Sequence, residues 1–99
     1  MTEKAHAFIQ SIQTGSEPDS SWPLALRALW WTGKGDWDKA HNLVARATSQ
    51  AESWVHAHLH RVEGDQANAA YWYKTAGKAA CELSFDEEFE TLVEALVDL

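Results

Sequence analysis

Three histidines at alternate positions, His56, His58 and His60, are the clearest candidates for chemistry in this chain. His56 and His60 are four residues apart, so they share one face of a helix, and Glu63 extends that face. Two imidazoles and a carboxylate at this spacing are ligands that suit zinc or a similar cation. The residue set therefore predicts a metal- or small-ligand-binding face as one candidate function.

A structural interpretation of the same histidines is favoured over the metal site. No H-E-x-x-H motif and no cysteine ligand accompanies them. His56 and His60 are expected to pack inside a helical hairpin and to hydrogen-bond to Tyr71 or Tyr73, with no metal or cofactor bound. His58 faces elsewhere and is expected to be partly exposed.

The other reactive side chains point to no catalytic site. Cys81 has no base near it in the sequence and is interpreted as a small, inert residue at a helix end. The acids between residues 82 and 98, including Glu88 and Glu90, are interpreted as the solvated face of a helix. The segment G-K-G-D (33–36) is too short to hold phosphate as a P-loop does. We therefore expect a protein that is not an enzyme.

Helical periodicity runs through the chain and predicts the elements that position these residues. Apolar or small side chains recur at i, i+3, i+4 and i+7, for example in residues 69–76. The segments 49–52 and 84–87 have the S-x-x-E spacing of a capping box, which starts a helix. No segment has the alternating pattern of a strand. We expect an all-α fold of about six helices with short connections.

Two central segments of the sequence repeat each other. A shift of 29 residues aligns G-D-W-D-K-A (35–40) with G-D-Q-A-N-A (64–69). In each copy the Gly-Asp pair makes a turn and caps the next helix, and two alanines seven residues apart let helices pack closely. The pattern resembles the tetratricopeptide repeat and its sel-like relatives, especially in A-A-Y-W-Y-K-T-A (69–76).

This resemblance implies a single all-α domain over residues 1–99, with tetratricopeptide-like hairpin repeats arranged as an α-α superhelix. Its parts are an N-terminal helix at 1–14, hairpins at 22–48 and 50–78, and an acidic capping helix at 84–98. Repeat units bury their faces only against neighbours. Both terminal helices are therefore expected to be caps, and the last one is expected to cover the end of the second hairpin.

The resemblance also implies a non-enzymatic scaffold that binds a protein or peptide on its concave face. The residues carried over to that face are Trp22, Leu29, Trp54, His58 and Arg61. Two alternatives stay open. One is a metal- or small-ligand-binding protein that uses His56, His60 and Glu63, and the other is a structural homo-oligomer such as a homodimer.

Composition and charge exclude several classes of partner. The net charge is −7, and residues 82–99 hold seven acids and no Lys or Arg. Without a basic surface to neutralise phosphates, we expect no binding to nucleic acid or to an anionic membrane. The single cysteine excludes an internal disulfide, and no apolar run has the length of a signal or a membrane span. We therefore expect a cytoplasmic protein.

Overall fold

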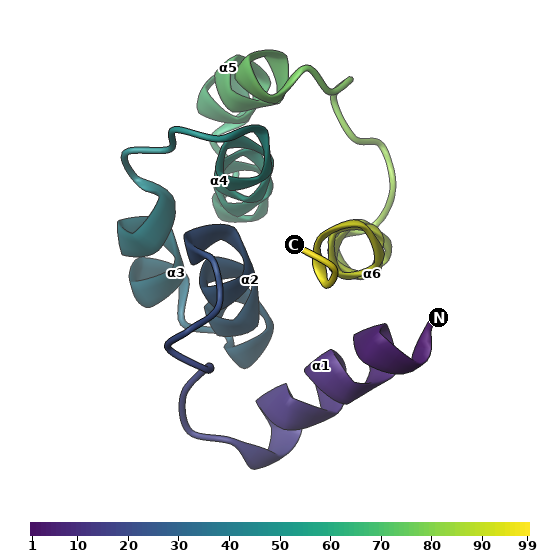
Figure 1. The fold of residues 1–99 in the computed structure, drawn as a ribbon. Helices are drawn as coiled ribbons and strands as arrows, with labels where there is room; N and C mark the ends of the chain where they lie inside the picture. Colours follow the sequence, from purple (N-terminus) through teal and green to yellow (C-terminus); the bar gives the residue numbers. More distant parts are fainter.

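The chain is entirely α-helical in the computed structural model, which describes all residues from Met1 to Leu99. The six helices are α1 (Glu3–Thr14), α2 (Leu24–Lys34), α3 (Trp37–Val44), α4 (Gln50–Glu63), α5 (Gln66–Ala76) and α6 (Phe85–Leu96) (Figure 1). No residue lies in a strand, so the all-α prediction is confirmed. Serines at positions 49 and 84 cap the first turns of α4 and α6, as the predicted capping boxes require.

Helix α2 packs on α3, and α4 packs on α5, through two turns of the same construction. Gly35 and Gly64 have positive φ angles of 85° and 90°, which glycine adopts without steric cost. The next residue, Asp36 or Asp65, donates its backbone N–H to the carbonyl five residues before it. Each Asp side chain accepts a hydrogen bond from the N–H three residues later, at 3.1 Å in both turns. The predicted functions of both Gly-Asp pairs are confirmed.

The two terminal helices lie on the same side of the hairpins. Helix α6 packs against α1, α2 and α4, and α1 also packs against α2 (Figure 1). Gly33 lies where these helices meet: a Cβ atom there would be 2.7 Å from Cδ1 of Ile12 in α1 and 2.8 Å from Cζ of Phe89 in α6. The absence of a side chain at position 33 therefore lets both terminal helices approach α2.

The position of α6 differs from the predicted cap over the second hairpin. Its buried residues are Glu88, Leu92, Val93 and Leu96, and the last three belong to the main core shared with α1, α2 and α4. Phe85, at the start of the helix, is 48% exposed and packs beside the guanidinium group of Arg61 in α4. The helix therefore fills the open side of α2 and α4 and does not extend the row of hairpins.

Polar contacts attach α1 to α2. The Lys34 ammonium donates to the carbonyls of Ile12 and Gly15, at 2.7 Å each, and so satisfies backbone acceptors at the end of α1. The indole N–H of the buried Trp30 donates to Ser11 Oγ at 3.1 Å. These bonds fix the end of α1 while Phe8 and other apolar residues of α1 fill the core.

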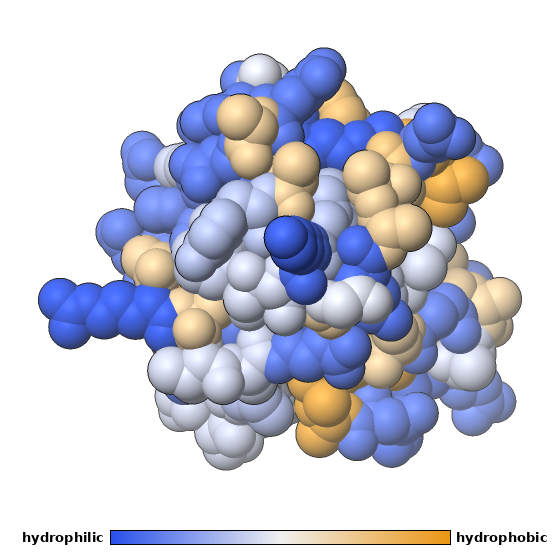
Figure 2. Space-filling view, turned by 90° about the horizontal axis from the view of Figure 1, so that it is seen from above, coloured by the Kyte–Doolittle hydropathy of each residue, from blue (hydrophilic) through white to orange (hydrophobic).

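The surface carries no large hydrophobic area on the side that Figure 2 shows. This view looks down on α5, and its hydrophobic side chains form small separate patches among hydrophilic ones. None of the six helices combines the length and the apolar character needed to cross a bilayer.

Candidate functional site

The residues predicted to bind a partner do not form one open surface. Leu29 is completely buried in the core, and His58 is only 2% exposed. Trp22, Trp54 and Arg61 are half-buried. The expected partial exposure of His58 is wrong, because α6 packs over that side of α4.

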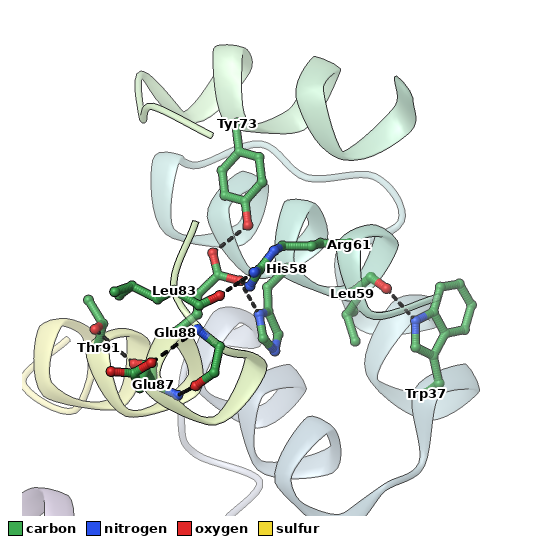
Figure 3. Close-up of polar contacts among 10 residues, drawn as sticks. Trp37, His58, Leu59, Arg61, Tyr73, Leu83, Glu87, Glu88 and Thr91 are labelled. Atoms are coloured by element: carbon green, nitrogen blue, oxygen red, sulfur yellow. Dashed lines mark hydrogen bonds and ion pairs between the residues drawn. The ribbon is translucent and has the colours of Figure 1, made fainter. Parts of the chain in front are cut away.

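A buried carboxylate joins α4, α5 and α6 at this place. Glu88 Oε1 accepts hydrogen bonds from His58 Nδ1 at 2.6 Å and from Arg61 at 3.0 Å, and Oε2 accepts one from the hydroxyl of Tyr73. Arg61 also donates to the carbonyl of Leu83, just before α6 (Figure 3). Glu88 is 2% exposed, so its predicted place on a solvated face is wrong.

The ionisation of this cluster indicates a structural role. Burial alone would raise the pKa of Glu88, but the hydrogen bonds from His58, Tyr73 and Arg61 outweigh it and lower the pKa to about 2. Burial and the bond to Glu88 raise the pKa of Tyr73 above its usual value. Burial also raises the pKa of the nearby Cys81 thiol, which makes it a poor nucleophile. Both oxygens of the carboxylate are bonded to side chains of the protein, and Glu88 is buried.

A second cluster lies where α4 meets α3 and α5. His56 Nε2 is 3.1 Å from Nε2 of His41 in α3, and its ring stacks on Trp72 of α5 at 4.1 Å between centroids. The ring of His60 is 4.7 Å from that of His56 and 5.2 Å from that of His41. One nitrogen from each of the three imidazoles lies within 4.8 Å of the other two. His56 and His60 are buried, and His41 is half-buried.

Neighbouring side chains hold two of these rings in place. His60 Nδ1 is 2.6 Å from Glu63 Oε1, and an ionised carboxylate can only accept, so Nδ1 is the donor and the neutral form of His60 has its lone pair on Nε2. Trp37 stacks on His41 with centroids 4.6 Å apart, and its own N–H donates to the carbonyl of Leu59 at 2.7 Å (Figure 3).

The electrostatics favour the neutral forms of His41 and His56. Burial lowers the pKa of His56 to about 4, and the charges on His60 and His41 act in the same direction, while the backbone of Val44 acts in the opposite direction. Burial also lowers the pKa of His41, and His60 adds to this effect while nearby carboxylates oppose it. His56 is therefore uncharged near neutral pH, which is the form that binds a metal ion.

The predicted hydrogen bonds from His56 and His60 to a tyrosine are wrong. Tyr71 is 60% exposed, and Tyr73 is bound to Glu88 on another side of the molecule. The two histidines instead contact a third histidine and, through His60, the carboxylate of the same helix. The structure thus keeps Glu63 beside His60, as the metal alternative supposed, and adds the imidazole of His41, which that alternative did not include.

His41 and Glu88 were the functional side chains that sequence reasoning missed. His41 is four residues after Trp37, so the two aromatic rings share a face of α3 beside the apolar stripe, and this spacing was a usable signal. Glu88 is four residues before Leu92, which places it on the apolar face of its helix.

Two of the three clustered histidines, His56 and His60, lie on α4 and the third, His41, lies on α3, so their association depends on the packing of α3 against α4. His60 is bonded to Glu63, and the ring of His41 is stacked on that of Trp37. No known family model matches this chain, and neither a curated protein nor a solved structure does.

Proposed function

We propose that this protein binds one divalent transition-metal ion through His41, His56 and His60. The observation that carries the proposal is the convergence of three imidazole nitrogens within 4.8 Å of one another. Neutral imidazoles suit zinc, copper, nickel and iron, and a set of three histidines is an established ligand group for zinc. The proposal follows the metal alternative left open by the sequence, with His41 replacing Glu63 as the third ligand.

The spacing of the nitrogens suits a tetrahedral ion. A Zn–N bond of about 2.0–2.1 Å places two ligands of a tetrahedron about 3.3 Å apart. The 3.1 Å between Nε2 of His41 and Nε2 of His56 is close to this value. The His60 nitrogen lies within 4.8 Å of the other two and would move closer to them on binding an ion.

Glu63 has the position of an outer-sphere residue. A histidine ligand usually donates its second N–H to a carboxylate or carbonyl, which sets the tautomer and raises the basicity of the ligating nitrogen. The hydrogen bond from His60 Nδ1 to Glu63 is of this type. His56 has no such partner, because its Nδ1 is buried without a hydrogen bond.

The repeat and scaffold interpretations have weaker support. The two equivalent Gly-Asp turns support our proposal that α2–α5 are two tetratricopeptide-like hairpins. Partner binding on the concave face is less well supported, because Leu29 and His58 are buried while α6 is in place. The cluster of His41, His56 and His60 does not depend on that face.

Zinc binding to the metal-stripped protein tests the proposal. We expect one equivalent of zinc by titration calorimetry. Zinc at 100 times its Kd should raise Tm by about 10–20 °C, because the ion stabilises the folded state by mass action. His41→Gln is the preferred ligand variant, because its side chain is half-buried and its replacement leaves no closed cavity.

Matched variants separate the cluster from other histidines. Glu63→Gln should weaken zinc binding about 10- to 100-fold, and His41→Gln by at least as much. His6→Gln, on an exposed site of α1, should bind zinc as the parent chain does. The proposal is wrong if zinc does not bind, or if His6→Gln loses as much affinity as His41→Gln.

A further inference from the structure

We infer that an ion in the histidine cluster keeps one coordination position open to solution, where it holds a water molecule that small monodentate ligands replace. This inference rests on the proposed metal binding and deepens it. It assigns the site to the class of open metal centres, in which the ion meets an external ligand, and separates it from closed sites that only hold the fold together.

The protein offers three donors and lacks a fourth. Tetrahedral structural zinc sites use four protein ligands, whereas open sites use three and a water. The histidine cluster contains no fourth side chain of the ligating types. Glu63 and Asp65 form a separate group of possible ligands with His60. Glu63 is bonded to Nδ1 of His60, whereas the proposed ligand atom is the other ring nitrogen, so Glu63 does not supply the fourth ligand.

The side chains that flank the cluster cannot complete the coordination. Trp37 stacks on His41, and Trp72 stacks on His56. An indole nitrogen is a donor without a lone pair for a metal, so neither tryptophan can be a ligand. His41 is half-buried, so one ring of the cluster is partly exposed, and the fourth position is inferred to lie on this side, where water can occupy it.

The charges around the histidine cluster affect which small ligands bind at the open coordination position, and so which ones are useful as probes. Glu63 is bonded to His60, and Asp38 lies in the first turn of α3, the helix that carries His41. These carboxylates attract the cation and partly offset its charge. They therefore weaken the binding of an anionic probe to the ion more than the binding of a neutral probe. A test therefore needs one anionic and one neutral probe.

Cobalt(II) in place of zinc provides the readout, since its visible absorption depends on the ligands and their geometry. The metal-stripped full chain is loaded with one equivalent of cobalt and titrated with azide and, separately, with imidazole. Each probe forms one bond to cobalt through nitrogen as the water leaves, without change of oxidation state. We expect a saturable spectral change with at least one probe, while dialysis shows that the cobalt stays bound.

The outcomes separate this inference from the proposed function. Cobalt that binds in one equivalent but keeps the same spectrum with both probes overturns the open position and leaves metal binding intact. Failure of cobalt and zinc to bind overturns both. The His6→Gln variant should respond as the parent chain does, and a response that this variant loses would place the cobalt outside the cluster.

Discussion

His58 lies between His56 and His60 in the sequence but contacts a different part of the molecule. Two positions along a helix correspond to a rotation of about 200°, so His58 points away from its two neighbours. It donates to Glu88 of α6, whereas His56 meets His41 of α3. One segment of α4 thus supplies a structural hydrogen bond on one side and candidate metal ligands on the other.

The Glu88 cluster predicts a specific loss of stability at low pH. The folded-state pKa of about 2 lies below the ordinary value of 4.5, so the ionised carboxylate stabilises the fold above pH 4.5. This contribution disappears as the pH falls from 4.5 towards 2. A shift of this size corresponds to about 3 kcal/mol, and Glu88→Gln should lower the free energy of unfolding by roughly that amount at pH 7.

Urea unfolding of both chains at pH 7 and pH 3 measures this contribution. We expect the difference between Glu88→Gln and the parent chain to shrink clearly at pH 3. Glu90→Gln is the control, because Glu90 is exposed on the same helix and should change stability little at either pH. An equal deficit of Glu88→Gln at both pH values would contradict the proposed ionisation.

At the scale of elements, the two Gly-Asp turns should contribute equally to stability. Asp36 and Asp65 each accept a hydrogen bond of 3.1 Å from the first turn of the next helix. Loss of such a cap costs about 1 kcal/mol, so Asp36→Ala and Asp65→Ala should each lower the free energy of unfolding by that amount. Asparagine keeps the accepting oxygen, and Asp36→Asn and Asp65→Asn should therefore retain most of the stability.

Chemical denaturation in the presence of a chelator measures the four variants without a contribution from metal. The double alanine variant should lose the sum of the single effects, because the two turns share no partner. If asparagine and alanine destabilise equally, the capping bond is not the cause. If only one turn responds, the two turns are equivalent in geometry but not in energy.

The helices and turns were predictable because their signals are local. Capping boxes, Gly-Asp pairs and apolar spacing all act within a few residues, and α3 to α5 follow them closely. The candidate site was predicted only in part. His56 and His60 share a helix and were found by spacing, whereas His41 joins them through packing between helices that no local pattern specifies.

Helix α6 shows the same limit for a longer connection. Residues 77–84 contain no helix or strand, and no local sequence pattern in this segment predicts where the chain places α6. The acidic composition of α6 indicated a solvated outer face, but the burial of Glu88 depends on three donors from α4 and α5. A charge of this kind can be recognised as buried only when its partners are known.

At the scale of the whole molecule, α6 completes the core. Leu92 and Val93 have no exposed surface, and Leu96 is 5% exposed, all within the cluster shared by α1, α2 and α4. Small domains bury only part of their surface and tolerate the loss of such a contribution poorly. The helix is also bonded to α1 at its far end, where the Thr2 N–H donates to Glu94.

Removal of residues 84–99 should therefore abolish cooperative unfolding and expose apolar surface of α1, α2 and α4. The expected result is aggregation or a loss of near-ultraviolet circular dichroism from the tryptophans, with much of the helical signal retained. Deletion of residues 98–99 alone is the matched control. It removes the exposed ion pair between Lys4 and Asp98, which contributes at most about 1 kcal/mol.

A synthetic peptide of residues 82–99 provides the decisive test of the same prediction. Because the residues of α6 that contact α1, α2 and α4 all lie on this one helix, an excess of the peptide should restore the near-ultraviolet signal of the truncated chain. A peptide with Glu88→Gln should restore the signal less well. A truncated chain that stays monomeric and unfolds cooperatively without peptide would show that α1–α5 form the stable unit. In that case the surface on α2 and α4 would be free for a partner, as the resemblance to repeat proteins implied.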